Sequence, residues 1–218
     1  MAPLLEAHQL RMRYGERALL DGVDLSLEPG TTTTLGGPSG SGKTTLLRLL
    51  GLLADPDDGT LRLDGRDVRT LSPPEARRRV ALVAQAPAMF EGTVLDNVAT
   101  GMRLQGKSLG ESEARLLLER VGLDGAFLSA DARALSGGEK LRVAVARALA
   151  LKPAVWLLDE PTAALDAERA RVLVELLKSL AREGAAVLVV THDADAVERL
   201  DGQRLWLDSG RLRKEKAP

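Results

Sequence analysis

The sequence has 218 residues, of which 44% are hydrophobic and 28% are charged, and its net charge is −1. This composition predicts a folded globular domain and excludes an intrinsically disordered chain. A near-neutral charge also argues against a general nucleic-acid binder, which normally presents a basic face. The chain has no cysteine, so disulfides, thiolate nucleophiles and cysteine metal sites are excluded.

The sequence offers no membrane-spanning or targeting segment. Residues 1–10 lack the basic start and apolar run of a signal peptide. The longest apolar stretches, 46–54 and 185–190, are shorter than the roughly 20 residues that a membrane span needs, and Arg48 interrupts the first. We therefore expect a cytoplasmic protein that acts at a membrane only through a partner.

The first third of the chain predicts strands and turns. Residues 23–27 alternate between apolar and polar side chains, as in a half-buried strand, and Glu28-Pro29-Gly30 predicts a turn. Residues 31–35 are short and β-branched, which predicts a buried strand, although an unusually polar one. Leu61 and Leu63 before Asp64-Gly65 predict a hairpin.

A glycine-rich segment follows the second of these strands and precedes a helix predicted over residues 43–53. It matches the P-loop pattern, Gly37-Pro38-Ser39-Gly40-Ser41-Gly42-Lys43-Thr44. Glycines let backbone N–H groups approach an anion closely, and the helix N-terminus is positive. Lys43 can neutralise phosphate charge, and Thr44 can offer a hydroxyl to Mg²⁺. The segment predicts nucleotide binding but does not separate kinases, GTPases and ATPases.

The middle of the chain predicts a helical lobe inserted over residues 86–133. The pattern is helical from Thr93 to Val121, with Leu116, Leu117 and Val121 on one side of a charged segment. Met89 and Phe90 are candidates for a groove that receives a partner helix. Local packing within the lobe is the alternative for both residues.

The segment Leu135-Ser136-Gly137-Gly138-Glu139 predicts the start of a further helix. Ser136 and Glu139 have the spacing of a capping box, and the helix should run through Ala150. Each glycine in the first turn costs about 1 kcal/mol relative to alanine. That cost is explained if this helix N-terminus must lie against a phosphate.

The last third of the chain predicts a strand–helix–strand unit. Residues 154–158 and 185–190 are apolar runs of strand length, which implies a right-handed crossover and a parallel sheet. Asp159 and Glu160 come at the carboxyl end of the first run, where open α/β sheets bind ligands. Asp159 can hold Mg²⁺, and Glu160 can orient or deprotonate water; a helix cap is the alternative. The predicted helix has an apolar face of Val172, Leu173, Leu176, Leu177 and Leu180.

Together, the motifs resemble those of the nucleotide-binding domain of ABC transporters, from about Leu4 to Leu212. Residues 135–139 resemble the family signature, and Ala164-Leu165-Asp166 resembles the D-loop. Lys140, which follows the signature, departs mildly from the family pattern, because many relatives carry glutamine or arginine at this position. By this resemblance, Tyr14 stacks on adenine, Gln85 is the Q-loop glutamine that senses Mg²⁺ and water, and His192 is the switch histidine that contacts the γ-phosphate.

The resemblance implies one domain over residues 1–218: an α/β P-loop NTPase with a parallel core sheet, an N-terminal antiparallel β subdomain and the inserted helical lobe. It implies an ATPase that dimerises around ATP and Mg²⁺ and powers a separate membrane permease at the inner face of the cell membrane. No nucleic-acid partner is expected. The implied metal ligands are Thr44, Gln85 and Asp159, and the catalytic residues are Glu160, His192 and Gln85. The implied ATP contacts are Tyr14, Gly37, Pro38, Ser39, Gly40, Ser41, Gly42, Lys43, Thr44, Thr45, Ser136, Gly137, Gly138, Glu139 and Asp166.

Other functions are compatible with parts of the pattern. A non-transport ABC ATPase with soluble partners, for example in iron–sulfur cluster assembly, is the main alternative. A GTPase is disfavoured because the one asparagine, Asn97, is not in an N-K-x-D segment, and a clamp without turnover is disfavoured by Glu160. Residues 85–97 and the compact lobe are similar to iron-exporter ATPases and also to phosphate-importer ones, and we favour the exporter.

Overall fold

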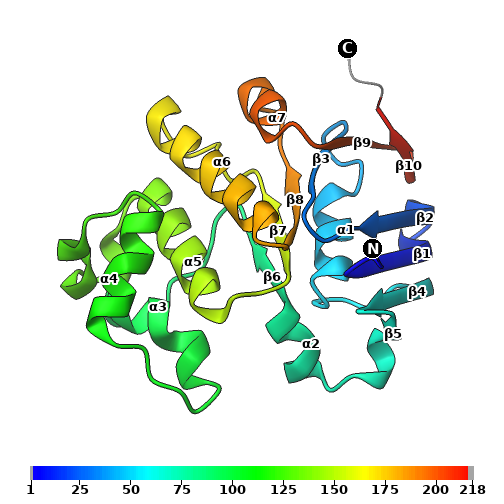
Figure 1. Cartoon of the computed structure of the whole chain (residues 1–218). Coiled ribbons are helices and arrows are strands. Elements are labelled where there is room, and N and C mark those ends of the chain that lie inside the picture. Colours follow the sequence, from blue (N-terminus) through cyan, green and yellow to red (C-terminus); the bar gives the residue numbers. More distant parts are fainter. Residues whose placement is uncertain (1, 216–218) are drawn as a thin grey trace.

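The computed structural model describes residues 2–215, which form two sheets and a set of helices (Figure 1). The strands are β1 (Leu5–Tyr14), β2 (Arg17–Leu27), β3 (Thr32–Gly36), β4 (Asp58–Leu63), β5 (Arg66–Asp67), β6 (Val80–Val83), β7 (Val155–Asp159), β8 (Ala186–Val190), β9 (Gln203–Asp208) and β10 (Arg211–Lys214). The α-helices are α1 (Lys43–Leu50), α2 (Pro73–Arg79), α3 (Val94–Arg103), α4 (Glu111–Arg120), α5 (Gly137–Leu151), α6 (Ala167–Arg182) and α7 (Ala194–Leu200).

The core sheet has six strands in the order β10-β9-β3-β8-β7-β6. Its strands are parallel from β9 to β6, and only β10 pairs antiparallel. The polar strand predicted over residues 31–35 is β3, and it lies inside this sheet. Its Thr32 hydroxyl donates to the Leu200 carbonyl oxygen at 2.9 Å, so a buried polar side chain is satisfied.

A second, antiparallel sheet has the order β2-β1-β4-β5 and contains most of the N-terminal chain. Figure 1 shows α1 between this sheet and the core sheet. The predicted hairpin at Asp64-Gly65 joins β4 to β5, with Leu63 opposite Arg66. The predicted α/β fold, with a parallel core sheet and an antiparallel β subdomain, is therefore confirmed.

Two hydrophobic clusters cover opposite faces of the core sheet. Leu157 of β7 packs into the cluster formed with α1 and the antiparallel sheet. Trp156, its neighbour in β7, packs into the cluster formed with α5, α6 and the helical lobe. Because successive side chains in a strand point to opposite faces, one buried strand supports both layers. The carboxyl ends of β3, β7 and β8 are thereby held rigidly together.

The helical lobe contains α3 and α4, followed by two 3₁₀ turns, Gly125–Ser129 and Ala132–Ala134. The continuous helical pattern predicted from Thr93 to Val121 is wrong in one respect, because the chain leaves the helix between α3 and α4. Of the predicted apolar face, Val121 is buried and Leu117 packs against the core, but Leu116 is 61% exposed. The buried residues within α4 itself are Ala114 and Leu118.

Two of the helix ends carry a capping box. Ser136 and Glu139 form the box predicted at the start of α5, and Thr93 and Asp96 form another at the start of α3. Hydrogen bonds from Thr93 and the Arg103 guanidinium lower the pKa of Asp96 to about 2. Helix α1 ends at Leu50 rather than residue 53, because Gly51 ends it and Leu52 takes φ 57°.

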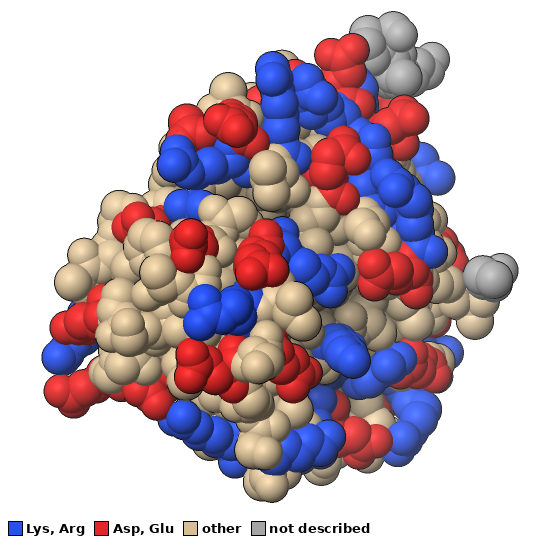
Figure 2. Space-filling model, turned by 60° about the vertical axis from the view of Figure 1, so that its left-hand side comes forward, with Lys and Arg blue, Asp and Glu red and all other residues tan. Residues whose placement is uncertain are grey.

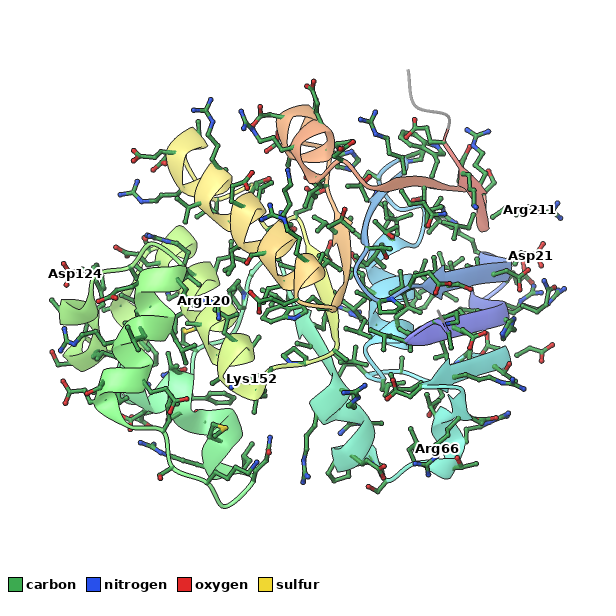
Figure 3. The ribbon with its side chains drawn as sticks, viewed as in Figure 1. Asp21, Arg66, Arg120, Asp124, Lys152 and Arg211 are labelled. Atoms are coloured by element: carbon green, nitrogen blue, oxygen red, sulfur yellow. The ribbon has the colours of Figure 1, made fainter. Side chains whose placement is uncertain are left out.

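The surface carries charges of both signs. Figure 2 shows acidic and basic side chains interspersed on the face that includes the lobe. Asp21 and Arg211 point toward one another at the outer ends of the two sheets (Figure 3). Arg211 Nη2 lies 3.6 Å from Asp21 Oδ2, and this salt bridge links β2 to β10. None of the helices in residues 2–215 is both long enough and apolar enough to cross a bilayer.

Candidate functional site

The predicted P-loop joins the end of β3 to the start of α1. Gly37, Gly40 and Gly42 all take positive φ values, of 144°, 72° and 102°. A Cβ on Gly37 would lie 2.2 Å from the Leu207 carbonyl oxygen, so only glycine fits there. No side chain caps α1 at Gly42, which leaves the first N–H groups of this helix available to an anion.

Lys43 is the buried cation of this loop. Its side chain is 9% exposed, and Nζ donates to the carbonyl oxygens of Gly37 at 2.8 Å and Pro38 at 2.9 Å. Within residues 2–215, no carboxylate forms a salt bridge with it, and the buried Ser41 hydroxyl has no hydrogen-bond partner. A buried cation and an unsatisfied hydroxyl in one loop fit a bound phosphate.

Thr44 and Asp159 bring two predicted metal ligands together. The Thr44 hydroxyl donates to Asp159 Oδ2 at 2.9 Å, although the two residues lie 115 positions apart in sequence. Gln85, just after β6, has an exposed side chain and lines the same hollow. A hydroxyl, a carboxylate and an amide oxygen are hard donors, so the residues present fit Mg²⁺.

Glu160 and His192 occupy the ends of neighbouring parallel strands, β7 and β8. The His192 backbone N–H donates to Glu160 Oε2 at 3.3 Å, and its Nε2 lies 3.5 Å from Oε1. Glu160 adopts φ 46°, which is uncommon for a residue with a side chain, and its N–H donates to the Val190 carbonyl oxygen at 2.8 Å. Positive φ in a non-glycine residue concentrates at functional sites.

These residues surround one open hollow of about 760 Å³. Arg17 and Leu19 of β2 also line it, and neither was predicted as a site residue. Arg17 Nη2 donates to the Gly40 carbonyl oxygen at 3.2 Å, so β2 is tied to the P-loop. Tyr14 pairs with Arg17 at the tip of the β1–β2 hairpin and is 82% exposed, but it does not line the hollow. The lining set is Arg17, Leu19, Ser39, Gly40, Gly42, Lys43, Thr44, Thr45, Gln85, Asp159, Glu160 and His192.

The predicted signature residues line a different hollow, of about 360 Å³. It is formed by the N-terminus of α5 and by the segment that precedes α6, and it shares no residue with the P-loop hollow. Hydrogen bonds from Ser136 lower the pKa of Glu139, whose carboxylate accepts from the Ser136 hydroxyl at 2.6 Å. The lining residues are Ser136, Gly137, Gly138, Glu139, Arg142, Ala164, Leu165, Asp166 and Arg169.

The two signature glycines differ in what surrounds them. A Cβ on Gly138 would lie 2.7 Å from the Ala164 carbonyl oxygen, so close packing against the D-loop requires glycine there. A Cβ on Gly137 would meet nothing nearer than 3.9 Å, so close packing does not explain this glycine. Asp166 caps α6 by accepting from the Arg169 backbone N–H at 2.9 Å, and Arg169 also lowers its pKa.

Comparison with known proteins decides the family. The family model described as "ABC transporter" matches residues 20–163, and a shorter AAA-domain model matches residues 131–198. The chain belongs to the ABC transporter nucleotide-binding domain family. A dimeric ATP-binding cassette bound to ADP and Pi has a TM-score of 0.88 and 33% identity to this domain, covering 97% of this chain and 98% of that one.

Curated relatives of the ABC domain are longer than this chain. The protein STAR1 of Oryza sativa subsp. japonica is 44% identical, over 84% of this chain and 53% of its own length. The sulfate/thiosulfate import ATP-binding protein CysA 2 of Chromobacterium violaceum is 41% identical, over 98% of this chain and 58% of its own length. This chain therefore spans between half and three fifths of these two relatives.

The ABC domain has a further groove of about 380 Å³ where the lobe meets the core. Two exposed apolar side chains line this groove: Phe90 is 52% exposed and Leu104 is 83% exposed. Its lining also includes three arginines but no acidic residue. Met89 packs against the core of the lobe instead. Of the two candidate residues, Phe90 rather than Met89 therefore stands at this groove. Its arginines are Arg77, Arg78 and Arg147.

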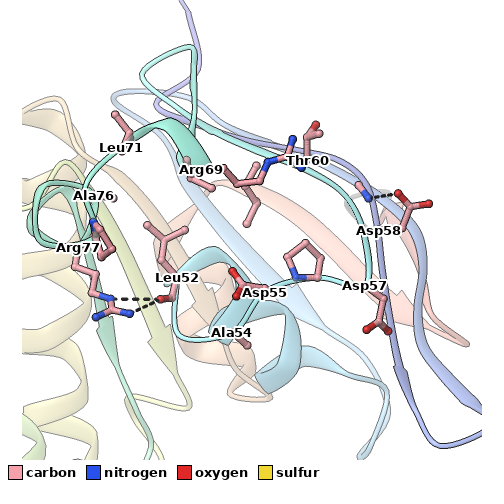
Figure 4. A pocket seen from close by; sticks show the side chains of 15 residues that line it. Leu52, Ala54, Asp55, Asp57, Asp58, Thr60, Arg69, Leu71, Ala76 and Arg77 are labelled. Atoms are coloured by element: carbon pink, nitrogen blue, oxygen red, sulfur yellow. Dashed lines mark hydrogen bonds between the residues drawn. The ribbon is translucent and has the colours of Figure 1, made fainter.

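A hollow of about 690 Å³ lies under the loop that follows α1, away from every predicted site residue (Figure 4). Arg77 Nη2 donates to the Leu52 carbonyl oxygen across it at 3.3 Å. Three of its other charged groups already have partners: Asp57 accepts from the Arg13 N–H, Asp58 accepts from the Gly59 N–H, and Arg69 pairs with Asp67. We assign it no ligand.

Proposed function

We propose that this chain binds ATP with Mg²⁺ and hydrolyses it between two copies of itself. The supporting observation is the separation of the two hollows. The P-loop hollow has a cation and free helix N–H groups for phosphate but no signature residue. The signature hollow has a helix N-terminus with no phosphate-binding loop. Two copies placed head to tail bring one hollow of each against the other, forming two equivalent sites.

Each predicted residue then has a defined task in the reaction. Lys43 and the N–H groups of α1 hold the phosphates. Thr44, Asp159 and Gln85 would hold Mg²⁺, which would neutralise phosphate charge when bound. Glu160 orients the attacking water and accepts its proton. His192 keeps the Glu160 carboxylate in place and contacts the terminal phosphate. Ser136, Gly137 and Gly138 of the second copy close the site.

The test is the dependence of ATP turnover on protein concentration. If the site is shared, turnover per chain rises with concentration until the dimer is fully formed, and then becomes constant. Glu160→Gln with ATP and Mg²⁺ should sediment as a dimer, because the bound ATP is retained. Turnover per chain that stays constant far below the dimer's dissociation constant would contradict the shared site.

We also propose that a membrane permease binds the groove that carries Phe90, so that the cytoplasmic chain sits at the inner face of the membrane. The groove has apolar walls and three arginines without an acid, which fits an amphipathic segment that bears a carboxylate. A photo-crosslinker at Phe90 should capture a membrane protein, whereas one at the exposed Leu116, on α4, should not. Capture of a soluble protein at Phe90 would favour the iron–sulfur assembly alternative.

The names of the relatives cover several cargoes. They include sulfate/thiosulfate, mycobactin and methionine import. Sequence similarity of this degree is therefore shared by proteins with different substrates. The resemblance to iron-exporter subunits stays a prediction. The physical reason is that cargo crosses the permease and does not touch the residues described above.

A further inference from the structure

Arg147 lies on α5, and its guanidinium reaches the segment that joins β6 to the helical lobe. Nη1 and Nη2 both donate to the Ala88 carbonyl oxygen at 3.3 Å. The guanidinium carbon lies 5.1 Å from the centroid of the Phe90 ring, which is a cation–π distance. Ala88 and Phe90 follow closely after Gln85, so Arg147 grips the chain just beyond the proposed Mg²⁺ ligand.

This segment has few other attachments. Within residues 2–215, the backbone of residues 85–91 is hydrogen-bonded only by the side chains of Arg147 and Asn97. The fully buried Asn97, on α3, accepts from the Phe90 N–H at 2.8 Å and donates to its carbonyl oxygen at 3.0 Å. Helices α3 and α5 pack together, so they set the position of Ala88 and Phe90.

Arg147 has no opposite charge beside it. In the part of the chain that the structure describes, no carboxylate forms a salt bridge with it, and burial lowers its pKa. Desolvating a cation without a counter-ion opposes folding, and an apolar side chain of similar length avoids that cost. The cost is offset by the two hydrogen bonds to the Ala88 carbonyl oxygen and by the contact with the Phe90 ring, and both of these interactions hold the segment that follows Gln85.

We propose that Arg147 is a positioning residue for Gln85. By fixing Ala88 and Phe90 to α5, it sets how far Gln85 projects into the hollow that contains Thr44 and Asp159. Pro87 stiffens the connection, since its ring fixes φ. Because Ser136 caps the N-terminus of α5, Arg147 also links Gln85, in the P-loop hollow, to the helix whose N-terminus forms the signature hollow. The inference rests on the proposed role of Gln85 at Mg²⁺ and the attacking water.

The test compares Arg147→Met, Gln85→Ala and the double variant in the full chain. Arg147→Met keeps the length of the side chain and removes its charge and donors. It should lower kcat at least about tenfold and raise the Mg²⁺ concentration for half-maximal turnover, with the ATP Kd within about threefold of wild type. Its Tm should be unchanged or higher. In the Gln85→Ala background, Arg147→Met should lower kcat by less than about a further twofold, because both changes remove the same function.

The results distinguish failure of the proposed role of Gln85 from failure of the positioning role of Arg147. If Gln85→Ala leaves kcat unchanged, the proposed role of Gln85 fails. If Gln85→Ala lowers kcat but Arg147→Met does not, or if the two losses multiply, the positioning role of Arg147 fails. A marked fall in Tm for Arg147→Met would also contradict it, because Arg147 would then be structural. Arg147→Lys, which keeps the charge but loses the fork, should still lower kcat. Arg182→Met, at a 68% exposed arginine of α6, is the matched control and should change nothing.

Discussion

His192 holds both oxygens of Glu160: its backbone N–H donates to Oε2 at 3.3 Å, and its Nε2 lies 3.5 Å from Oε1. The contact joins the ends of β7 and β8, which are parallel neighbours in the core sheet. Glu160 is only 19% exposed and adopts φ 46°. The sheet therefore constrains the Glu160 backbone and His192 contacts its side chain, an arrangement that suits the general base proposed above.

Glu160→Gln keeps the size of this side chain and removes its basicity. We expect ATP to bind normally and turnover to fall at least about 10²-fold, the usual cost of losing a positioned base. Phosphate release and the ATP Kd, measured on the same preparation, provide the check. Glu119→Gln, on the exposed face of α4, makes the same chemical change away from the site and should leave turnover and the ATP Kd unchanged. Turnover of Glu160→Gln within about threefold of wild type would refute the assignment.

Lys43→Ala should weaken ATP binding itself. The side chain is buried, with its ammonium on the Gly37 and Pro38 carbonyl oxygens, so it already lies where phosphate charge would sit. A hydrogen bond to a charged group contributes about 1.5–3 kcal/mol, which predicts a rise in Kd of roughly 10–100-fold. Calorimetry with Mg²⁺ measures it, and Lys107→Ala at an exposed lysine is the control. An unchanged Kd would show that Lys43 does not contact the nucleotide.

Tyr14→Ala should weaken ATP and GTP to the same extent. Tyr14 is 82% exposed beside Arg17, so its ring is free to stack on a base but reads no hydrogen-bonding edge. Stacking of this kind contributes roughly 1–3 kcal/mol. Parallel titrations with the two nucleotides provide the measurement. A loss for ATP alone would indicate an adenine-specific contact, and no loss would remove Tyr14 from the site.

Asp96→Asn should destabilise the lobe at neutral pH but not in acid. The pKa of Asp96 is lowered to about 2 by Thr93 and Arg103, so its charge favours the folded state above the unfolded pKa, which is near 4. That contribution is lost as the pH falls through the folded pKa. A charge at a helix N-terminus contributes about 0.3–1 kcal/mol. Urea unfolding at pH 7 and below pH 2 gives the free energy of unfolding of the variant and of the wild type. The variant should be less stable at pH 7 and equally stable in acid. An equal loss of stability at both pH values would exclude ionisation of Asp96 as the cause.

The sequence predicted local motifs better than the ends and faces of helices. The P-loop, the Asp159-Glu160 pair and the Ser136–Glu139 capping box are contiguous patterns with a local physical cause, and the structure places each on its expected element. Helix ends and faces were less well predicted. Helix α1 stops at Leu50 because Gly51 and Leu52 leave the helix, and the face of α4 is set by its packing on α5.

The residues that sequence reasoning missed act through tertiary contacts. Arg17 meets Gly40, and Arg147 meets Ala88, across 59 positions in the second case. Neither arginine belongs to a motif with a spacing that sequence alone could interpret. Arg17 does stand opposite Tyr14 in the β1–β2 hairpin, so pairing the two strands from sequence would have placed it beside the residue expected to stack on adenine.

Ser136→Arg tests most directly whether each ATP site is shared between two copies of the chain. A bulky cation at Ser136 blocks the signature hollow without touching Lys43, because the two residues line separate hollows. The change also removes a helix cap, at a cost of about 1 kcal/mol, so folding must be verified by circular dichroism. Ser136→Arg and Lys43→Ala should each be inactive, Ser136→Arg should still bind ATP, and mixing them should restore part of the turnover. The restored turnover comes from heterodimers, in which one site carries both lesions and the other carries neither. Loss of ATP binding by folded, monomeric Ser136→Arg, or heterodimers without turnover, would contradict the shared site.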